Sequence, residues 1–258
     1  IVAIAISSGY KHILNVFVDA GVDKMSFNST MSASGVMVYY KDELIHSSVT
    51  ILKQSTNNIG ELLAILIGVN TAIGIKREIN KENPVIERIN IYSDSSYSVD
   101  SITRWYSRWL MNGRNEKDGS LYTLSGKVKN QEIIEAIIRS VIAGNERINF
   151  VKVRGHQNPN NGISIDKNMG YIIDSNRYTI EKWDYYDQCE CYVNTEITKS
   201  IIERNNLVDQ LAGSMYPTSK DEYNLLPTIR DILPMVLYNI TPEEYERFEL
   251  LTHFHEYN

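Results

Sequence analysis

The chain has 258 residues, of which 43% are hydrophobic and 22% are charged, and this composition excludes an intrinsically disordered protein. Its two cysteines, Cys189 and Cys191, exclude a disulfide-stabilised scaffold and favour a reducing compartment such as the cytoplasm. The formal net charge of −6 is unusual for a protein that binds nucleic acid. Any such binding would therefore depend on local basic patches.

The predicted elements begin with three strands and continue with alternating helices and strands. Strands are expected near 13–18, 34–40, 45–52, 86–92 and 148–153, and helices near 59–79, 95–111, 131–143 and 203–215. Short links predict that the first three strands pair antiparallel, and the first helix must cross over to a strand parallel to the first strand. We therefore expect an α/β fold with a mixed five-stranded sheet flanked by helices.

Four acidic residues stand in settings that suit a shared site. Asp19 closes the first predicted strand, and Asp94 closes the fourth just before a helix. Glu61 lies in a long apolar helical stretch, where a solubilising role is uncommon, and Asp209 lies beside the buried stripe of the helix predicted at 203–215. Carboxylates at the ends of neighbouring strands could meet, and the two helices could bring the other two.

Several carboxylates at short range repel one another and are tolerated when cations neutralise them. Hard oxygen ligands indicate Mg²⁺ or Mn²⁺, and a pair of such ions can support hydrolysis of a phosphodiester. Each acid taken alone is more often a strand terminus, a helix cap or a solvated side chain. Four acids in fitting positions together favour a metal site.

The amino-acid sequence and the order of these segments resemble those of ribonuclease H of type 1, the class found in bacteria, eukaryotes and reverse transcriptases. The resemblance rests on FVDAG around Asp19, TNNIGEL around Glu61, IYSDSSY around Asp94 and VKVRGH ending at His156. It covers about residues 12–157 and 203–215.

The resemblance implies a divalent-metal-dependent endonuclease that hydrolyses the RNA strand of RNA–DNA hybrids by a two-metal-ion mechanism, with water as the nucleophile. Asp19, Glu61, Asp94 and Asp209 match the metal ligands, and His156 matches a histidine that assists catalysis. Two Mg²⁺ ions are the expected cofactor, with Mn²⁺ able to substitute.

The resemblance also implies a set of substrate-binding residues: Thr56, Asn57, Asn58, Ser96, Trp105, Trp109 and Lys129. Amides such as Asn57 and Asn58 can donate to and accept from a ribose 2′-hydroxyl, and Thr56 matches a phosphate-pocket residue. Trp105 and Trp109 match an aromatic pair near the DNA backbone, although aromatics four apart on a helix are equally often core. Nearby cations could contact phosphate or form a solvated face.

Three departures from the family keep alternatives open. The segment 22–30 replaces a glycine-rich loop, Ser96 stands where glutamine is frequent, and an insertion at about 158–202 separates His156 from Asp209. The alternatives are a catalytically weak ribonuclease H-derived nucleic-acid-binding or scaffold module, and a nuclease for a different duplex.

We expect a catalytic domain at 1–216 and a C-terminal extension at 217–258 with a helix near 242–253. The insertion is rich in aromatic residues and contains a predicted hairpin with its turn at 174–176. Insertion or extension could recruit a protein partner, or the insertion could be a tolerated surface loop. A zinc site from the two cysteines with His253 and His255 is disfavoured by their spacing, and no membrane span is expected.

Overall fold

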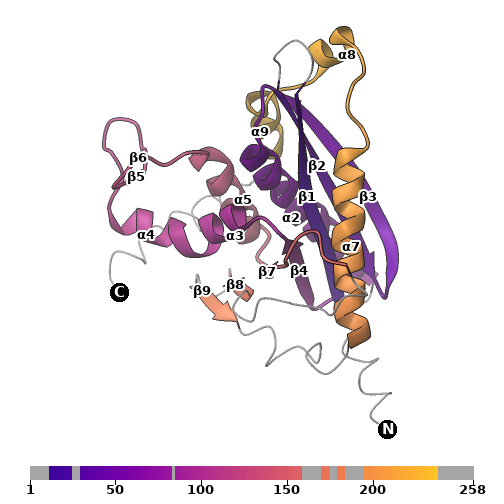
Figure 1. The fold of residues 1–258 in the computed structure, drawn as a ribbon. Coiled ribbons are helices and arrows are strands. Elements are labelled where there is room, and N and C mark those ends of the chain that lie inside the picture. The colour runs from indigo at the N-terminus through magenta and orange to yellow at the C-terminus, as the bar shows by residue number, and fades with distance from the viewer. Residues whose placement is uncertain are drawn as a thin grey trace.

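The structure, a computed structural model, describes residues 12–24, 30–82, 85–158, 170–174, 179–183 and 195–237. A seven-stranded sheet of order β3-β2-β1-β4-β7-β8-β9 lies at its centre (Figure 1). Its strands are β1 Ile13–Lys24, β2 Thr30–Tyr40, β3 Glu43–Lys53, β4 Arg88–Ser93, β7 Arg147–Lys152, β8 Gly170–Asp174 and β9 Thr179–Trp183. The helices are α2 Asn57–Glu82, α3 Ser96–Asp100, the π-helical turn η1 Ser101–Trp105, α4 Tyr106–Met111, α5 Gln131–Ala143, α7 Thr195–Gly213, α8 Lys220–Leu225 and α9 Ile229–Leu237. A separate small hairpin consists of β5 Tyr122–Thr123 and β6 Gly126–Lys127.

The predicted mixed five-stranded sheet is confirmed. Strands β1, β2 and β3 pair antiparallel, β4 runs parallel to β1, and β7 runs parallel to β4. The insertion adds two strands, because β8 pairs antiparallel with β7 and β9 with β8. The two strands of the hairpin predicted in the insertion are therefore present. Asp174, predicted as a turn residue, is the last residue of β8, and residues 175–178 lie outside the described residues.

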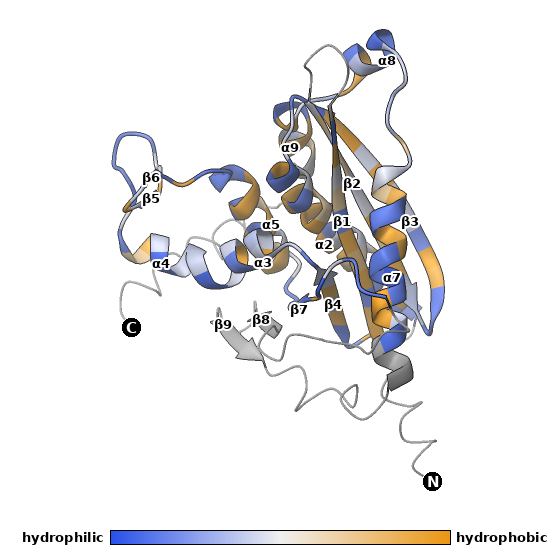
Figure 2. Ribbon diagram, viewed as in Figure 1, coloured by the Kyte–Doolittle hydropathy of each residue, from blue (hydrophilic) through white to orange (hydrophobic). Residues whose placement is uncertain are grey.

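The two faces of the sheet are covered by different helices. Leu14, Val16 and Val18 of β1 join the larger core with α2 and α5, whereas Phe17 belongs to a smaller core with Val208 of α7. This alternation is the period of two of a β-strand buried on both faces. Figure 2 shows hydrophobic residues concentrated on β1 and α2 and a more hydrophilic surface around β5 and β6.

The first strand continues beyond the acidic residue that was expected to end it. The antiparallel ladder with β2 extends to Lys24 opposite Thr30, whereas the parallel pairing with β4 stops at Phe17 opposite Tyr92. The expectation that Asp19 closes its strand is thus wrong. Asp19 lies instead just past the point where β1 stops pairing with β4.

The helix predicted at 95–111 is interrupted. Ser95 caps α3, because its hydroxyl accepts a hydrogen bond of 3.3 Å from the Ser98 N–H, and the π-helical turn η1 then separates α3 from α4. Helix α7 begins at Thr195, whereas its start was predicted near residue 203. The β5–β6 hairpin, α8 and α9 were not predicted.

The segment 217–237 packs against the sheet and α5. The Lys53 N–H donates to the Pro227 carbonyl (3.0 Å), Lys53 Nζ donates to the Asn224 carbonyl (2.6 Å), and Leu233 of α9 is buried in the larger core. Helix α8 begins with a capping box between Ser219 and Glu222. These contacts hold α8 and α9 at the end of β3, where the link to α2 begins.

Some expectations concern residues that the structure does not describe. They are the helix at 242–253 and the cysteine and histidine residues weighed for zinc, Cys189, Cys191, His253 and His255. Among the described helices, α2 is long and apolar enough to cross a membrane, but 61% of its most apolar window is buried inside the structure. Core helices of this kind pass the same test.

Candidate metal centre and substrate surface

Three of the four predicted acidic residues converge. Asp19 on β1, Glu61 on α2 and Asp94 after β4 each offer a carboxylate oxygen, and these oxygens lie within 4.8 Å of one another. Asp19 and Glu61 are each 4% exposed, whereas Asp94 is half-buried, so two of the three carboxyls are closed to bulk water. Strand β1, the start of α2 and the end of β4 thus bring together residues distant in sequence.

Helix α2 carries Glu61 to the sheet through a close approach. A Cβ on Gly60 would lie 2.8 Å from Ser32 Cβ and 3.0 Å from Ala20 Cβ, so a larger residue would push the helix away. The Ser34 hydroxyl donates to the Gly60 carbonyl (2.8 Å) and ties this turn to β2. Glu61 follows directly and is therefore placed beside Asp19.

Asp209 and His156 lie at the rim of the cluster. Asp209 Oδ2 is 3.7 Å from His156 Nδ1, and the two side chains are 42% and 83% exposed. Asp209 is not one of the three residues within 4.8 Å, yet its charge acts on both Asp19 and Asp94. His156 has a left-handed backbone with φ of 53°, which turns the chain sharply after β7.

The cluster strongly favours protonated carboxyls when no cation is present. Burial, reinforced by the charge of Asp94, raises the pKa of Asp19 to about 8 despite a hydrogen bond from the Ala20 N–H. Burial, reinforced by Asp19, raises the pKa of Glu61 to about 9. Burial also raises the pKa of Asp94, while the Asn205 amide opposes the shift. Bound cations would offset the burial and the repulsion that together retain these protons.

Two buried oxygens on residues of this site lack a hydrogen-bond donor within the described part of the chain. Among the described residues, no hydrogen-bond donor reaches Glu61 Oε2 or Asn205 Oδ1. Asn205 lies one helical turn before Asp209 on α7, is 2% exposed, and its Nδ2 lies 3.5 Å from Asp94 Oδ2. Carboxylate and amide oxygens are hard ligands of the kind that Mg²⁺ and Mn²⁺ prefer. The acidic triad could therefore bind a divalent metal ion.

Asn205 is a residue of the site that the sequence did not reveal. Its spacing of four residues from Asp209 is a usable signal, because positions i and i+4 share one face of a helix. Amides are frequent in helices without any such role, so the spacing alone was not distinctive.

Replacing Gly155 by alanine should weaken metal binding, because the new Cβ would overlap Asp94 Oδ2 and displace that carboxylate. We expect at least roughly a tenfold loss of Mn²⁺ affinity, comparable to losses seen when a partner of a metal ligand is disturbed. Isothermal titration calorimetry would measure it. Gly74→Ala on α2 is the control, since a Cβ there meets nothing within 4 Å. Equal affinity in the two variants would refute this account of Gly155.

The predicted RNA-contacting residues lie next to the triad. Thr56, Asn57 and Asn58 are exposed at the β3–α2 link, and Asn57 Nδ2 is 3.5 Å from Glu61 Oε1. The Thr56 hydroxyl accepts from the Ile59 N–H (3.3 Å) and caps α2. Ser96 is exposed at the start of α3, two residues after Asp94.

Trp105 and Trp109 are adjacent and only half-buried. Their ring centroids are 6.2 Å apart, Trp105 also meets the Tyr97 ring at 6.1 Å, and Trp109 packs against the larger core. The pair thus takes part in packing and still presents surface. Lys129 is exposed nearby, and its carbonyl accepts a hydrogen bond from the Tyr97 hydroxyl (3.4 Å).

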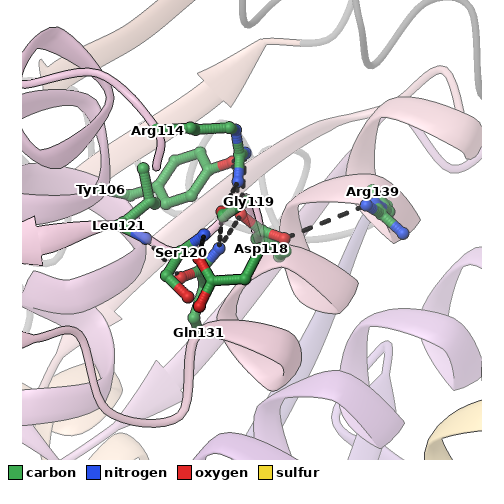
Figure 3. Close-up of polar contacts among 9 residues, drawn as sticks. Tyr106, Arg114, Asp118, Gly119, Ser120, Leu121, Gln131 and Arg139 are labelled. Carbon is green, nitrogen blue, oxygen red and sulfur yellow. Dashed lines mark hydrogen bonds and ion pairs between the residues drawn. The ribbon is translucent and has the colours of Figure 1, made fainter. Parts of the chain in front are cut away.

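A network of polar contacts attaches the segment 112–130, here called the arm, to α5 (Figure 3). The Arg114 guanidinium lies 2.8 Å from Glu135 Oε1 and donates to the Tyr106 hydroxyl (3.2 Å) and the Gly119 carbonyl (3.1 Å). Gln131 donates to the same Gly119 carbonyl (3.1 Å) and accepts from the Leu121 N–H (2.8 Å). The arm, which carries exposed Lys127 and Lys129, is thereby fixed in place.

Arg114→Met should loosen the arm, because the Glu135 side chain, 11% exposed, would lose its nearest cation and, among the described residues, keep Arg139 at 3.9 Å. Removing one partner of a buried pair typically costs several kcal/mol, so we expect a loss of about 2–4 kcal/mol. Amide hydrogen exchange within the arm should accelerate by an order of magnitude or more. Lys117→Met, which removes an exposed arm cation outside the network, is the control; similar exchange rates in both variants would contradict the prediction.

The strand order, the crossover helix and the buried acidic cluster define an α/β protein with a candidate metal centre at the ends of its parallel strands. The chain belongs to the ribonuclease H family, whose model matches residues 11–168. Ribonuclease HI of Haemophilus influenzae is 32% identical over 103 residues, which are 40% of this chain and 54% of that protein. Ribonuclease H of Bordetella pertussis is 30% identical over 104 residues, 40% and 55% of the two chains. The chain thus spans about half the length of the curated relatives it matches.

Two solved structures are also similar. The prototype foamy virus protease–reverse transcriptase has a TM-score of 0.48 and 15% identity, covering 79% of this chain and 21% of that chain. LC9-RNase H1, described as a type 1 RNase H with the type 2 active-site motif, has a TM-score of 0.40 and 17% identity, covering 73% and 85%. The family match ends at residue 168, so Asn205 and Asp209 on α7 lie beyond it.

Proposed function

We propose that the protein is a divalent-metal-dependent endonuclease that hydrolyses the RNA strand of RNA–DNA hybrids. The observation that carries this proposal is the convergence of Asp19, Glu61 and Asp94 within 4.8 Å in a chain of the ribonuclease H family. The relatives named ribonuclease H and ribonuclease HI support the same reaction class.

The metal ligands would be Asp19, Glu61, Asp94 and Asp209, with two Mg²⁺ ions as the cofactor and Mn²⁺ as a substitute. When bound, the cations supply Lewis acidity for hydrolysis of a phosphodiester and offset charge on the phosphate. The buried carboxyls must release their protons to accept cations, because their pKa values are raised by burial. His156, exposed and 3.7 Å from Asp209, would assist proton transfer or product release.

The substrate would lie across the exposed residues beside the triad. Asn57 and Asn58, both exposed, would read 2′-hydroxyls of the RNA strand in the shallow minor groove of a hybrid. Thr56, Ser96 and Lys129 would contact phosphate or sugar, and the open faces of Trp105 and Trp109 would pack on the DNA strand.

Cleavage of end-labelled RNA–DNA hybrid, duplex RNA and duplex DNA in Mg²⁺, Mn²⁺ or chelator tests the proposal. We expect cutting of the RNA strand of the hybrid alone, dependent on either metal. Hybrid binding without cleavage in every condition would indicate a nucleic-acid-binding or scaffold module instead. Preferential cutting of another duplex would contradict the proposed substrate and remain consistent with the proposed metal-dependent hydrolysis.

A further inference from the structure

Three asparagines lie side by side on neighbouring strands, on the face of the sheet that α7 covers. Asn15 of β1 pairs in register with Asn90 of β4, which pairs with Asn149 of β7. Their exposed fractions are 6%, 1% and 2%. Asparagine is uncommon in strands and is seldom buried, so three in one row need a physical reason.

The three side chains, here called the asparagine ladder, are joined by hydrogen bonds. Asn149 Nδ2 donates to Asn90 Oδ1 (2.7 Å), and Asn90 Nδ2 donates to Asn15 Oδ1 (3.3 Å). The Tyr92 hydroxyl accepts from Asn90 Nδ2 (3.2 Å) and donates to Asn15 Oδ1 (3.1 Å). Each strand of the parallel centre is therefore tied to the next through side chains as well as backbone.

The ladder lies on the same face of the sheet as Asp19, whereas Glu61 reaches the cluster from α2 on the opposite face. Side chains two residues apart in a strand share a face, so Phe17 follows Asn15 and Tyr92 follows Asn90. These two rings stack with centroids 4.6 Å apart and an interplanar angle of 8°. Two residues further along the chain are Asp19, still within β1, and Asp94, the first residue after β4.

The apolar pattern of the strands does not by itself choose this register. If β1 moved by two residues relative to β4, Leu14, Val16 and Val18 would still face α2, because a shift of two preserves each side chain's face. Asp19 and Asp94 repel each other and so favour any register that separates them. The ladder opposes such a shift, since Asn90 would then lie opposite Phe17 or Ile13, depending on the direction, and its buried amide would lose its partners.

We propose that the asparagine ladder, with the Tyr92 hydroxyl, is a positioning device that fixes the register of β1 against β4 and so holds Asp19 opposite Asp94. Its importance for catalysis rests on the proposed function, whereas its effect on register and metal binding does not. Buried polar groups that select one alignment among several apolar ones are known in other architectures, where a single asparagine can set the register.

The test removes the whole network at once with Asn15→Leu, Asn90→Leu, Asn149→Leu and Tyr92→Phe. Replacing all partners by apolar groups of similar shape leaves no orphaned amide, so the variant should unfold at a temperature close to that of the wild-type protein. We expect cross-strand amide contacts in NMR spectra to report more than one β1–β4 register. Mn²⁺ affinity measured by calorimetry should fall at least tenfold.

The control pair is Val16→Ala with Ile91→Val, which are cross-strand neighbours on the opposite face and are fully buried. This control should lower the unfolding temperature and keep a single register and wild-type Mn²⁺ affinity. If the fourfold variant does not fold, Asn90→Leu alone should still bind Mn²⁺ more weakly than a control with equal loss of stability.

A fourfold variant with one wild-type register and unchanged Mn²⁺ affinity would overturn the proposal, as would an Asn90→Leu variant whose Mn²⁺ affinity equals that of its control. Neither readout requires nuclease activity. If the wild-type protein binds Mn²⁺ and does not cut the hybrid, the proposed function is refuted. The role of the asparagine ladder would still be tested by the β1–β4 register and the Mn²⁺ affinity of the variants.

Discussion

Asp19→Asn should reduce cleavage of the RNA–DNA hybrid by at least about a thousandfold, because stabilisation by a metal centre contributes several kcal/mol to catalysis. Asp19 is the central member of the cluster: it interacts electrostatically with Glu61, Asp94 and Asp209. An amide in its place has the same size and keeps one oxygen, but it carries no charge to hold a cation. Single-turnover cleavage in Mg²⁺ and Mn²⁺ would measure the effect.

The same substitution should stabilise the metal-free protein, since it removes one of three repelling carboxyls that are buried together. If the substitution abolished activity by misfolding the protein, stability would fall instead. A stability measurement therefore distinguishes loss of the metal centre from misfolding. Glu82→Gln, an exposed acid at the end of α2, is the matched control and should change neither property. Near-normal cleavage by the Asp19→Asn variant would refute the assignment of the metal centre.

Much of this site could be predicted because its residues lie in strongly patterned segments. The apolar residues before Asp19 predict a strand, and those around Glu61 predict a helix. Because this helix crosses over to a strand parallel to the first, Asp19 and Glu61 could be predicted to lie close together. Helix α5 was predicted with its observed bounds, 131–143, since its apolar residues recur at helical spacing.

The parts that were missed depend on contacts between distant segments. The extension of β1 past Asp19 depends on its ladder with β2, not on its own sequence. The π-helical turn η1 leaves no mark in the hydrophobic spacing. The asparagine ladder depends on a register that links positions 15, 90 and 149, which no local pattern reveals.

The position of helix α7 also depends on contacts between segments that are distant in sequence. Arg204 lies over the Tyr39 ring at 4.2 Å and pairs with Asp42 at 2.9 Å, which fixes α7 to the β2–β3 hairpin. Neither contact could be inferred from sequence, yet both help to place Asn205 and Asp209. The site is therefore set by the tertiary docking of α7 as much as by the motifs.

The metal-free protein should lose stability as pH rises from about 4 to about 9, relative to Asp19→Asn. Asp19 and Glu61 have ordinary pKa values near 4 in the unfolded chain, and burial raises them to about 8 and about 9 in the folded state. Between these limits the folded state binds more protons than the unfolded state, so the free energy of unfolding falls as pH rises. The contribution is complete below pH 4 and is lost as pH passes through the folded pKa values.

The two carboxyls raise each other's pKa, so their contributions share one repulsion and do not simply add. We expect a difference between wild type and Asp19→Asn on the order of 3 kcal/mol at pH 9, or roughly 6–12 °C in unfolding temperature, and little difference at pH 4. Mg²⁺ should cancel the loss in wild type alone, contributing about 2.7 kcal/mol at a hundred times its Kd. Thermal unfolding followed by circular dichroism at pH 4, 7 and 9, in chelator and in Mg²⁺, gives these values. Parallel pH curves for the two proteins in chelator would show that the folded-state pKa of Asp19 is not raised, because a raised pKa makes removal of this acid stabilising at high pH and neutral at low pH.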